Sequence, residues 1–358
     1  MQTIQRETST SEQDDRLVEM LHKPIEEIDL AYFNSAVQYL RNTVNKDIAE
    51  IVRPLGTTAV DVAGTGGSGI VKFNTSTAAS FILAAHGVDV IKFGNRSITG
   101  PSGSLDFLGA IGCLKEVHAA DIERVFKSTN LLFLSAPNCY PNLASIRDAR
   151  KTIGRPTIFN FIGPLLNPAR PAYRLMGISN SYMHLLINQF IKTDASTKRA
   201  ITAHSTIRTG AVPTEVDEIL PYVSNTATLI EQSLSGNYTP RVSVIDIGCQ
   251  SATGAIDDSQ TFAGIYGDSR TSDAFGANEL GSTPAVNSAD VNAKIFLTII
   301  DGNDTSSIHY KGLLLNAAAA FLATGAVSAF DEGVALTKTL LANKSVKAKL
   351  DQVRRVLS

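Results

Sequence analysis

The sequence contains no tryptophan, only three cysteines and almost no net charge. Cys113, Cys139 and Cys249 are far apart and lack C-x-x-C spacing, which argues against a disulfide framework and against a structural zinc site. With 32 Lys and Arg against 34 Asp and Glu, the net charge of −2 gives no global attraction to nucleic acid or to an anionic membrane. These absences predict a cytoplasmic protein that has no membrane partner and for which nucleic acid is a disfavoured ligand.

Three further features are missing from the chain. The N-terminus, MQTIQRETSTSEQDDR, lacks the basic and apolar regions of a signal peptide. The most apolar window, residues 312–330, is interrupted by polar residues and glycines, so it predicts a buried core helix rather than a membrane span. None of the six histidines has H-E-x-x-H spacing and no G-x-S-x-G occurs, which disfavours zinc-dependent and serine hydrolysis.

Most of the chain alternates between short apolar runs and helical patterns. Residues 15–50 have helical spacing only, and after Gly56 a β-branched run, a glycine-rich turn, a helix and a second apolar run follow. This β-loop-α-β order predicts an α/β body with a parallel sheet. Residues 250–292 predict long surface loops, and residues 293–358 return to helix. The predicted strands are residues 59–63, 88–93, 131–134, 157–161, 174–178, 200–203 and 241–247.

The glycine-rich turn Gly64-Thr65-Gly66-Gly67-Ser68-Gly69 lies between the first predicted strand and a helix that begins at Thr75-Ser76-Thr77. Glycines permit a positive φ and a close approach of the backbone, and the helix N-terminus adds partial positive charge. A phosphate group is therefore the predicted ligand. The turn also matches G-x-G-x-x-G, but Asp89 opens the second strand instead of closing it, which argues against a dinucleotide-binding unit.

A second loop follows the second predicted strand. Lys92 and Arg96 flank a glycine there, and a serine-rich loop (SITGPSGS) comes next. Because ligands bind at the carboxyl ends of parallel strands, two such loops predict a ligand with more than one phosphate group. Asp217 and Glu218, adjacent in TEVDEIL, supply oxygen ligands of the kind that hold Mg²⁺ beside a polyphosphate.

Several stretches together resemble the anthranilate phosphoribosyltransferase family. They are DVAGTGGSG, FNTST, VIKFGNRSITGPSGSLDFLGAIG, RKTIGRPTIFNFIGPLLNPA and LLLNAAAAF, and they occur in the family's order. The resemblance covers most of the chain from Asp61 onward and weakens between Pro221 and Asp290. It implies a helical N-terminal domain at residues 1–56, with helices from about residue 103 to 150 packing on it, and an α/β domain at residues 57–358 with a mainly parallel central sheet.

The same resemblance implies a reaction and an assembly. The family transfers the phosphoribosyl group of phosphoribosyl pyrophosphate to the amine of anthranilate in tryptophan biosynthesis, and releases pyrophosphate. Two Mg²⁺ ions per active site and a homodimer are expected. No side chain is assigned as a catalytic acid or base, because positioning and charge neutralisation supply the chemistry.

Site residues follow from the matching motifs. Asn95 and Arg150 are expected to face the acceptor, Arg150 because a guanidinium can bind its carboxylate through two hydrogen bonds. Ser76 is expected to bind one Mg²⁺, and Asp217 with Glu218 the other. The residues expected to hold phosphoribosyl pyrophosphate are Gly64, Thr65, Gly66, Gly67, Asn74, Ser76, Thr77, Lys92 and Ser104.

Four departures from the family pattern concern mainly the acceptor. Ser68 stands where the family has aspartate in GTGGD, and Phe93 and Tyr140 stand where it has histidines, in KHGNR and before the proline of the APN segment. The segment between His204 and Asp217 has an apparent insertion. Phe93 and Tyr140 are therefore expected at a more apolar acceptor pocket that is less able to relay a proton.

Three alternatives to anthranilate transfer stay open. The first is a paralogue that uses another aromatic amine or carboxylate as acceptor. The second is a catalytically silent ligand-binding or nucleic-acid-binding relative, and the third, phosphorolysis of a nucleoside, follows only from a shared fold.

Overall fold

The computed structural model describes the chain except for a few segments. The described residues are 10–97, 102–115, 117–207, 213–221, 223–232, 241–245 and 288–358. The surface loops predicted for residues 250–292 therefore lie almost wholly outside the described residues. Helix α12 (Ala289–Ile300) begins at the end of that range, four residues before the predicted return to helix at residue 293.

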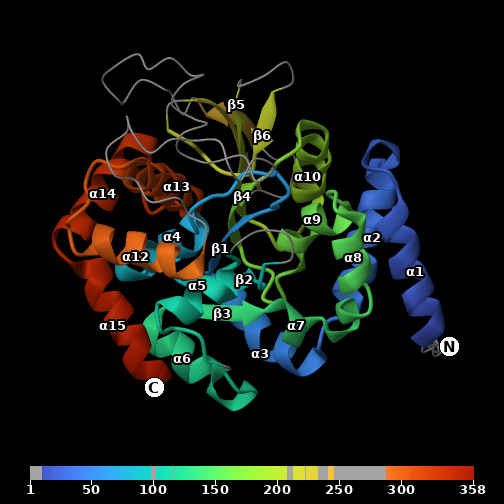
Figure 1. The fold of residues 1–358 in the computed structure, drawn as a ribbon, viewed down its shortest axis with the longest axis horizontal. Helices are drawn as coiled ribbons and strands as arrows, with labels where there is room; N and C mark the ends of the chain where they lie inside the picture. The colour runs from blue at the N-terminus through green and yellow to red at the C-terminus, as the bar shows by residue number, and fades with distance from the viewer. Residues whose placement is uncertain are drawn as a thin grey trace.

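A central sheet of eight strands runs through the molecule (Figure 1). The strand order is β3-β2-β1-β4-β5-β7-β8, and β6 pairs with the end of β5 on the edge opposite β7. Strands β1 to β5 are parallel to one another, whereas β6, β7 and β8 pair in antiparallel fashion. The strands are β1 (Val60–Gly64), β2 (Val90–Gly94), β3 (Leu131–Ser135), β4 (Tyr173–Gly177), β5 (Arg199–Ile207), β6 (Thr214–Val216), β7 (Ser224–Glu231) and β8 (Arg241–Ile245).

Six of the seven predicted strands are confirmed, and one prediction is wrong. Residues 157–161, rich in β-branched and aromatic side chains, form the helix α9 (Ile158–Ile162). The Thr157 N–H donates to Oδ1 of Asn160 (3.0 Å), which caps the start of this helix. Tertiary packing and the cap outweigh the strand propensity of the side chains. Strands β6 and β7 were not predicted.

Helices cover both faces of the sheet. Helices α4 (Thr75–Ala85) and α13 (Ile308–Thr324) pack on one face, with α14 (Phe330–Ala342) and α15 (Ser345–Leu357) against them. Figure 1 shows these C-terminal helices on one side of the sheet and α1, α2 and α8 to α10 on the other. Helix α13 is almost entirely buried, which confirms the core helix predicted in this part of the chain. No helix among the described residues is long and apolar enough to span a membrane.

The N-terminal helices pack against elements from the middle of the chain. Helix α2 (Leu30–Asn42) contacts α10 (Ser181–Thr193), α1 (Thr10–His22) contacts α9, and α3 (Lys46–Gly56) contacts α6 (Ile122–Thr129). The Asn45 N–H donates to the carbonyl of Cys139 (2.8 Å). The shorter connecting helices are η1 (Ile25–Glu27), α5 (Ser104–Ala110), η2 (Ala119–Asp121), α7 (Ala136–Cys139), η3 (Pro141–Ala144), α8 (Arg147–Ile153) and η4 (Gly163–Leu166).

Two buried histidines join α10 to β5. His184 Nδ1 lies 2.8 Å from His204 Nδ1, and His184 Nε2 lies 2.8 Å from the Thr202 hydroxyl. Because that hydroxyl donates to Asn188 Oδ1 (2.6 Å), it accepts from a proton on His184 Nε2. His184 Nδ1 must then accept from His204, and both imidazoles are neutral.

We expect this pair to destabilise the fold in acid. Burial, and then the charge of His204, lower the pKa of His184 to about 4 from 6.5. Burial also lowers the pKa of His204, and the charge of Glu215 offsets this only in part. The unfolded chain therefore binds the proton more readily, so stability falls as the pH falls from 6.5 towards 4. The loss is at most about 3 kcal/mol at about 1.4 kcal/mol per pKa unit. When the unfolding free energy is measured with urea at several pH values in this window, it should fall less steeply with decreasing pH in His184→Gln than in the parent protein. An equal dependence on pH would contradict the assignment.

Candidate active site

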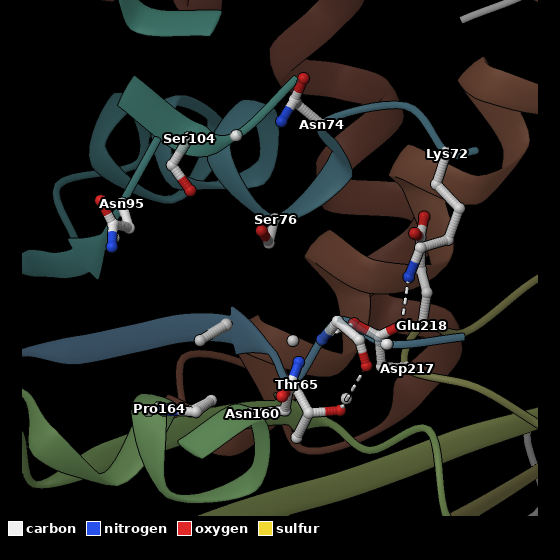
Figure 2. Close-up of a pocket in the computed structure, with 18 of the residues that line it drawn as sticks. Thr65, Lys72, Asn74, Ser76, Asn95, Ser104, Asn160, Pro164, Asp217 and Glu218 are labelled. Carbon is white, nitrogen blue, oxygen red and sulfur yellow. Dashed lines mark hydrogen bonds and ion pairs between the residues drawn. The ribbon is translucent and has the colours of Figure 1, made fainter. Parts of the chain in front are cut away.

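A cavity of about 460 Å³ opens at the carboxyl ends of β1, β2 and β4. It is lined by the glycine loop after β1, the start of α4, the loop after β2, and residues of α8 and α9. Figure 2 shows its polar lining, with Ser76, Asn95 and Ser104 across the space from Asp217 and Glu218. The loops predicted separately from the sequence thus meet around one space.

The glycine loop has a backbone that other residues adopt poorly. Gly66, Gly67 and Gly69 have φ values of +67°, +81° and +72°. A hydrogen bond from Ser179 N–H to the Thr65 hydroxyl (3.1 Å) ties the loop to the segment after β4, and the Ser179 hydroxyl donates to the Gly66 carbonyl (2.5 Å). These hydrogen bonds with Ser179 fix the glycine loop beside the cavity.

The start of α4 also faces the cavity. Asn74 occupies the N-cap position but makes no capping hydrogen bond; its Oδ1 instead accepts from the Ser102 hydroxyl (2.8 Å). Among the described residues, the Ser76 backbone N–H has no hydrogen-bond partner. An exposed N–H at the positive end of a helix is suited to an anionic oxygen.

Lys92 lies beneath the start of this helix. Its side chain is buried in the middle of β2, and its Nζ donates to the carbonyl of Val62 and to the Ser76 hydroxyl (3.2 Å). Burial lowers the pKa of Lys92 to about 8, although the nearby charge of Asp61 raises it. The ammonium group therefore reaches the cavity from within the sheet, not from a loop at its edge.

Asp217 is fitted closely against two glycines. It follows β6, and its Oδ2 accepts from the Gly66 N–H (2.7 Å). A Cβ on Gly64 would lie 2.4 Å from Asp217 Oδ2, and a Cβ on Gly177 would lie 1.9 Å from the Asp217 carbonyl oxygen. Glycine at both positions is thus required for this placement of the carboxylate.

The neighbouring backbone is held by Asn316 from α13. Its Nδ2 donates to the Ile219 carbonyl (2.8 Å) and its Oδ1 accepts from the Ile219 N–H (3.2 Å). The Ser205 hydroxyl donates to the Glu218 carbonyl. The hairpin of β5 and β6, which contains the apparent insertion, thus delivers Asp217 and Glu218 to a fixed position.

Glu218 and Lys72 complete the acidic end of the cavity. Burial raises the pKa of Glu218 to about 7, while Lys72 and a hydrogen bond from Thr75 lower it and Asp217 raises it. Lys72 forms an ion pair with Asp217 Oδ1. Burial is therefore the main cause of the raised pKa of Glu218, and the charge of Lys72 offsets it only in part.

Arg150 lies at the other end of the cavity. It belongs to α8, and its guanidinium carbon lies 5.6 Å from the centre of the Phe159 ring. Burial lowers the pKa of Arg150, and among the described residues no carboxylate forms an ion pair with it. Asn95 also lines the cavity, and its Oδ1 accepts from the Arg96 N–H (2.8 Å). A guanidinium that is stacked but unpaired can receive a carboxylate.

Two of the predicted site residues do not line the cavity. Thr77 is fully buried in the first turn of α4, and Tyr140 lies behind Phe93, with ring centres 5.9 Å apart. The Tyr140 hydroxyl donates to the Leu166 carbonyl (2.6 Å). Phe93 itself does line the cavity, so the aromatic pair makes an apolar wall with Tyr140 as its second layer.

The remaining predicted residues are brought together, and others appear beside them. Gly64, Thr65, Gly66, Gly67, Asn74, Ser76, Lys92, Phe93, Asn95, Ser104, Arg150, Asp217 and Glu218 all line the cavity. Lys72, Asn160 and Asn316 line it too and were not predicted as site residues. Asn160 and Asn316 lie in the stretches RKTIGRPTIFNFIGPLLNPA and LLLNAAAAF, which could have indicated them; no sequence signal singled out Lys72.

Comparisons with known proteins agree with this arrangement. The sequence profile of the family described as "Glycosyl transferase family, a/b domain" matches residues 56–216. An anthranilate phosphoribosyltransferase of Streptococcus pneumoniae is 32% identical over 295 residues, which are 82% of this chain and 76% of that one. One from Methanococcus aeolicus is 29% identical over 92% of this chain and 91% of its own length. One from Syntrophomonas wolfei is 36% identical over 52% of this chain and 57% of its own length.

Solved structures show the same fold. The anthranilate phosphoribosyltransferase of Thermus thermophilus superposes with a TM-score of 0.61 at 19% identity, over 98% of this chain and 96% of that one. That of Saccharomyces cerevisiae in complex with PRPP and Mg superposes with a TM-score of 0.62 at 18% identity, over 98% and 93%. Since a relative that is 32% identical is covered over 76% of its length and solved structures share the fold, the chain belongs to the anthranilate phosphoribosyltransferase family.

Proposed function

We propose that this chain transfers the phosphoribosyl group of phosphoribosyl pyrophosphate to the amine of anthranilate and releases pyrophosphate, a step of tryptophan biosynthesis. The observation that carries the proposal is one cavity with two unlike ends. One end has backbone N–H groups, Lys92 and two carboxylates. The other has the Arg150 guanidinium beside aromatic rings, and no carboxylate in the described ranges pairs with it. A polyphosphate suits the first end and an aromatic carboxylate the second.

The donor is bound at the first end. The glycine loop and the Ser76 N–H at the start of α4 offer backbone donors to phosphate oxygens. Lys92 supplies a positive charge beneath them, and Ser104 and Asn74 supply polar side chains at the rim. The resemblance of these motifs to the family supports the same donor-binding role for Gly64, Thr65, Gly66 and Gly67.

The donor set fits Mg²⁺. The acidic end offers oxygen ligands from the adjacent carboxyl groups of Asp217 and Glu218, both of which line the cavity. Mg²⁺ needs only one or two protein carboxylates, because water and substrate phosphates complete its coordination. Asp217 and Glu218 would hold one ion, and the Ser76 hydroxyl a second. Bound Mg²⁺ neutralises the charge that builds on pyrophosphate as it leaves.

The protein itself binds and orients the two substrates. As the bond from the ribose C1 to pyrophosphate breaks, the ribose gains oxocarbenium character and the acceptor amine attacks C1. Loop N–H groups and Lys92 stabilise the leaving group, and the wall of Phe93, with Tyr140 behind it, excludes water from the acceptor end. No side chain needs to form a covalent bond, so most of the rate comes from holding the two reactants in position.

Replacing Arg150 by alanine tests the acceptor end. We expect KM for anthranilate to rise by about 10- to 100-fold, the 1.5–3 kcal/mol of a charge-assisted hydrogen bond, while KM for phosphoribosyl pyrophosphate changes little. Steady-state kinetics with each substrate varied in turn give both constants. Equal increases in the two KM values would remove Arg150 from the acceptor site.

The apolar wall favours a second candidate function, in which the acceptor is not anthranilate. Phe93 has no proton to exchange, and the hydroxyl of Tyr140 is already bonded to the Leu166 carbonyl. A paralogue that uses another aromatic amine or carboxylate would share the same donor end. A panel of such acceptors distinguishes the two, because only the true acceptor drives rapid release of pyrophosphate.

The setting of the reaction is part of the same proposal. We infer a homodimer in the cytoplasm, with the substrates lying between a helical part at residues 1–56 and an α/β part at residues 57–358. Sedimentation at micromolar protein concentration tests the dimer.

A further inference from the structure

Lys72 places an ammonium group at the acidic end of the cavity. It lies between the glycine loop and α4, and its Nζ pairs with Asp217 Oδ1. The two side chains are 15% and 5% exposed. Figure 2 shows Lys72, Asp217 and Glu218 gathered at the same end of the space.

The ion pair leaves Asp217 with both oxygens in use. Oδ1 receives the ammonium and Oδ2 receives the Gly66 N–H (2.7 Å). In the described part of the chain, the other cations that line the cavity lie away from the carboxylates: Lys92 lies under Ser76, Arg96 pairs with Asp106 (3.0 Å), and Arg150 lies at the opposite end of the cavity. Lys72 is thus the cation that balances the two carboxylates, and its charge acts on Glu218 as well.

A divalent ion and an ammonium cannot share one carboxylate oxygen at full strength. A metal ion that binds Asp217 must displace Lys72 or accept a repulsive neighbour, and either costs binding free energy. Once displaced, the ammonium group remains on a long flexible side chain beside the glycine loop. It can then attract a phosphate oxygen of the donor.

We propose that Lys72 is an internal cation of the pyrophosphate site that competes with Mg²⁺ for Asp217 and supports pyrophosphate binding when the metal is scarce. The competition concerns the metal alone. The second part deepens the proposed function and rests on it, because it requires that pyrophosphate binds in this cavity.

Metal binding tests the competition without turnover. Mn²⁺ is titrated into the full chain with no substrate present, and free Mn²⁺ is followed by its electron paramagnetic resonance signal. We expect Lys72→Met to bind Mn²⁺ about tenfold more tightly than the parent protein, the equivalent of one pKa unit of charge interaction. Equal or weaker binding by Lys72→Met would overturn the proposal.

Two further variants make the result specific. Lys338→Met makes the same change in net charge at an exposed position on α14, and its Mn²⁺ affinity should equal that of the parent. Lys72→Arg keeps the positive charge and should restore the parent affinity. Tight Mn²⁺ binding by Lys72→Arg would mean that the shape of the lysine, not its charge, matters, and would contradict the proposal. Thermal unfolding of each variant checks that the fold is retained.

Inorganic pyrophosphate tests the second part. With a chelator present to remove divalent metal, calorimetry should show that pyrophosphate binds the parent protein about tenfold more tightly than Lys72→Met, again the size of one charge interaction. Equal affinities would overturn this part. Anthranilate consumption is measured separately, so an enzyme with another acceptor can still show both effects of Lys72.

Discussion

Replacing Gly177 by alanine is expected to lower kcat/KM by about a hundredfold or more, the loss typical of a misplacement of about 1 Å at a catalytic site. The new Cβ would lie 1.9 Å from the Asp217 carbonyl oxygen and 3.1 Å from the Glu218 nitrogen. Both contacts involve backbone, which cannot rotate away. The carboxylates at the acidic end must therefore shift, although Gly177 itself touches no substrate in the proposed reaction.

A glycine outside the cavity provides the control for Gly177. A Cβ on Gly109, which is exposed on helix α5, would lie 3.6 Å from Leu114 Cδ2, which is an ordinary contact. Gly109→Ala should keep full activity. Steady-state kinetics and Mn²⁺ titration of Gly177→Ala should both show the loss, and a Gly177→Ala protein with parental metal affinity and turnover would disprove the role given to this close packing.

The largest loss of stability is expected from Arg41→Ala. Arg41, on α2, pairs with Asp194 after α10 (2.8 Å), and the two side chains are 3% and 6% exposed. Removing one partner of a buried pair leaves an uncompensated charge, which costs about 3–5 kcal/mol of unfolding free energy. Urea unfolding at neutral pH measures this cost directly. Because the pair joins an N-terminal helix to the α/β body, its loss should not selectively raise either substrate KM.

The exposed pair of Lys127 and Glu123 provides the comparison for Arg41. These side chains are 69% and 56% exposed, so Lys127→Ala should leave stability unchanged. A similar loss in both variants would show that burial does not decide the effect.

The pair also predicts an acid dependence. Burial alone would raise the pKa of Asp194, but hydrogen bonds and charge from Arg41 lower it overall, well below 3.8. Stability from this carboxylate is therefore present above the unfolded pKa and is lost as the pH falls through the folded pKa. The loss of stability below about pH 4 should be smaller in Arg41→Ala, because the carboxylate has lost its partner.

Much of the fold could be predicted from the sequence, because its signals are local. The alternation of β-branched runs and helical patterns predicted six strands, and the glycine loop could be placed between β1 and α4. The antiparallel strands β6 and β7 escaped prediction, because β6 is only three residues long and β7 (SNTATLIE) begins with mostly polar side chains. The strand predicted for residues 157–161 was wrong because strand propensity does not take account of the helix cap between Thr157 and Asn160.

The candidate site divides in the same way. The glycine loop and the acidic pair each consist of residues that are adjacent in the sequence, so their place at one site could be predicted. The partner of Asp217 could not, because Lys72 is separated from it by 145 positions and has no motif of its own. The position of Tyr140 behind Phe93 likewise depends on the packing of α7 against the sheet.

The most direct test of the proposed reaction is the loss of anthranilate fluorescence with phosphoribosyl pyrophosphate and Mg²⁺, with pyrophosphate release measured in parallel. We predict rapid loss of anthranilate with one pyrophosphate released for each molecule consumed. Pyrophosphate release that requires a different aromatic amine or carboxylate, with anthranilate unchanged, would contradict the assignment of the acceptor. No release with any acceptor in the panel would contradict transferase activity and favour a silent ligand-binding relative.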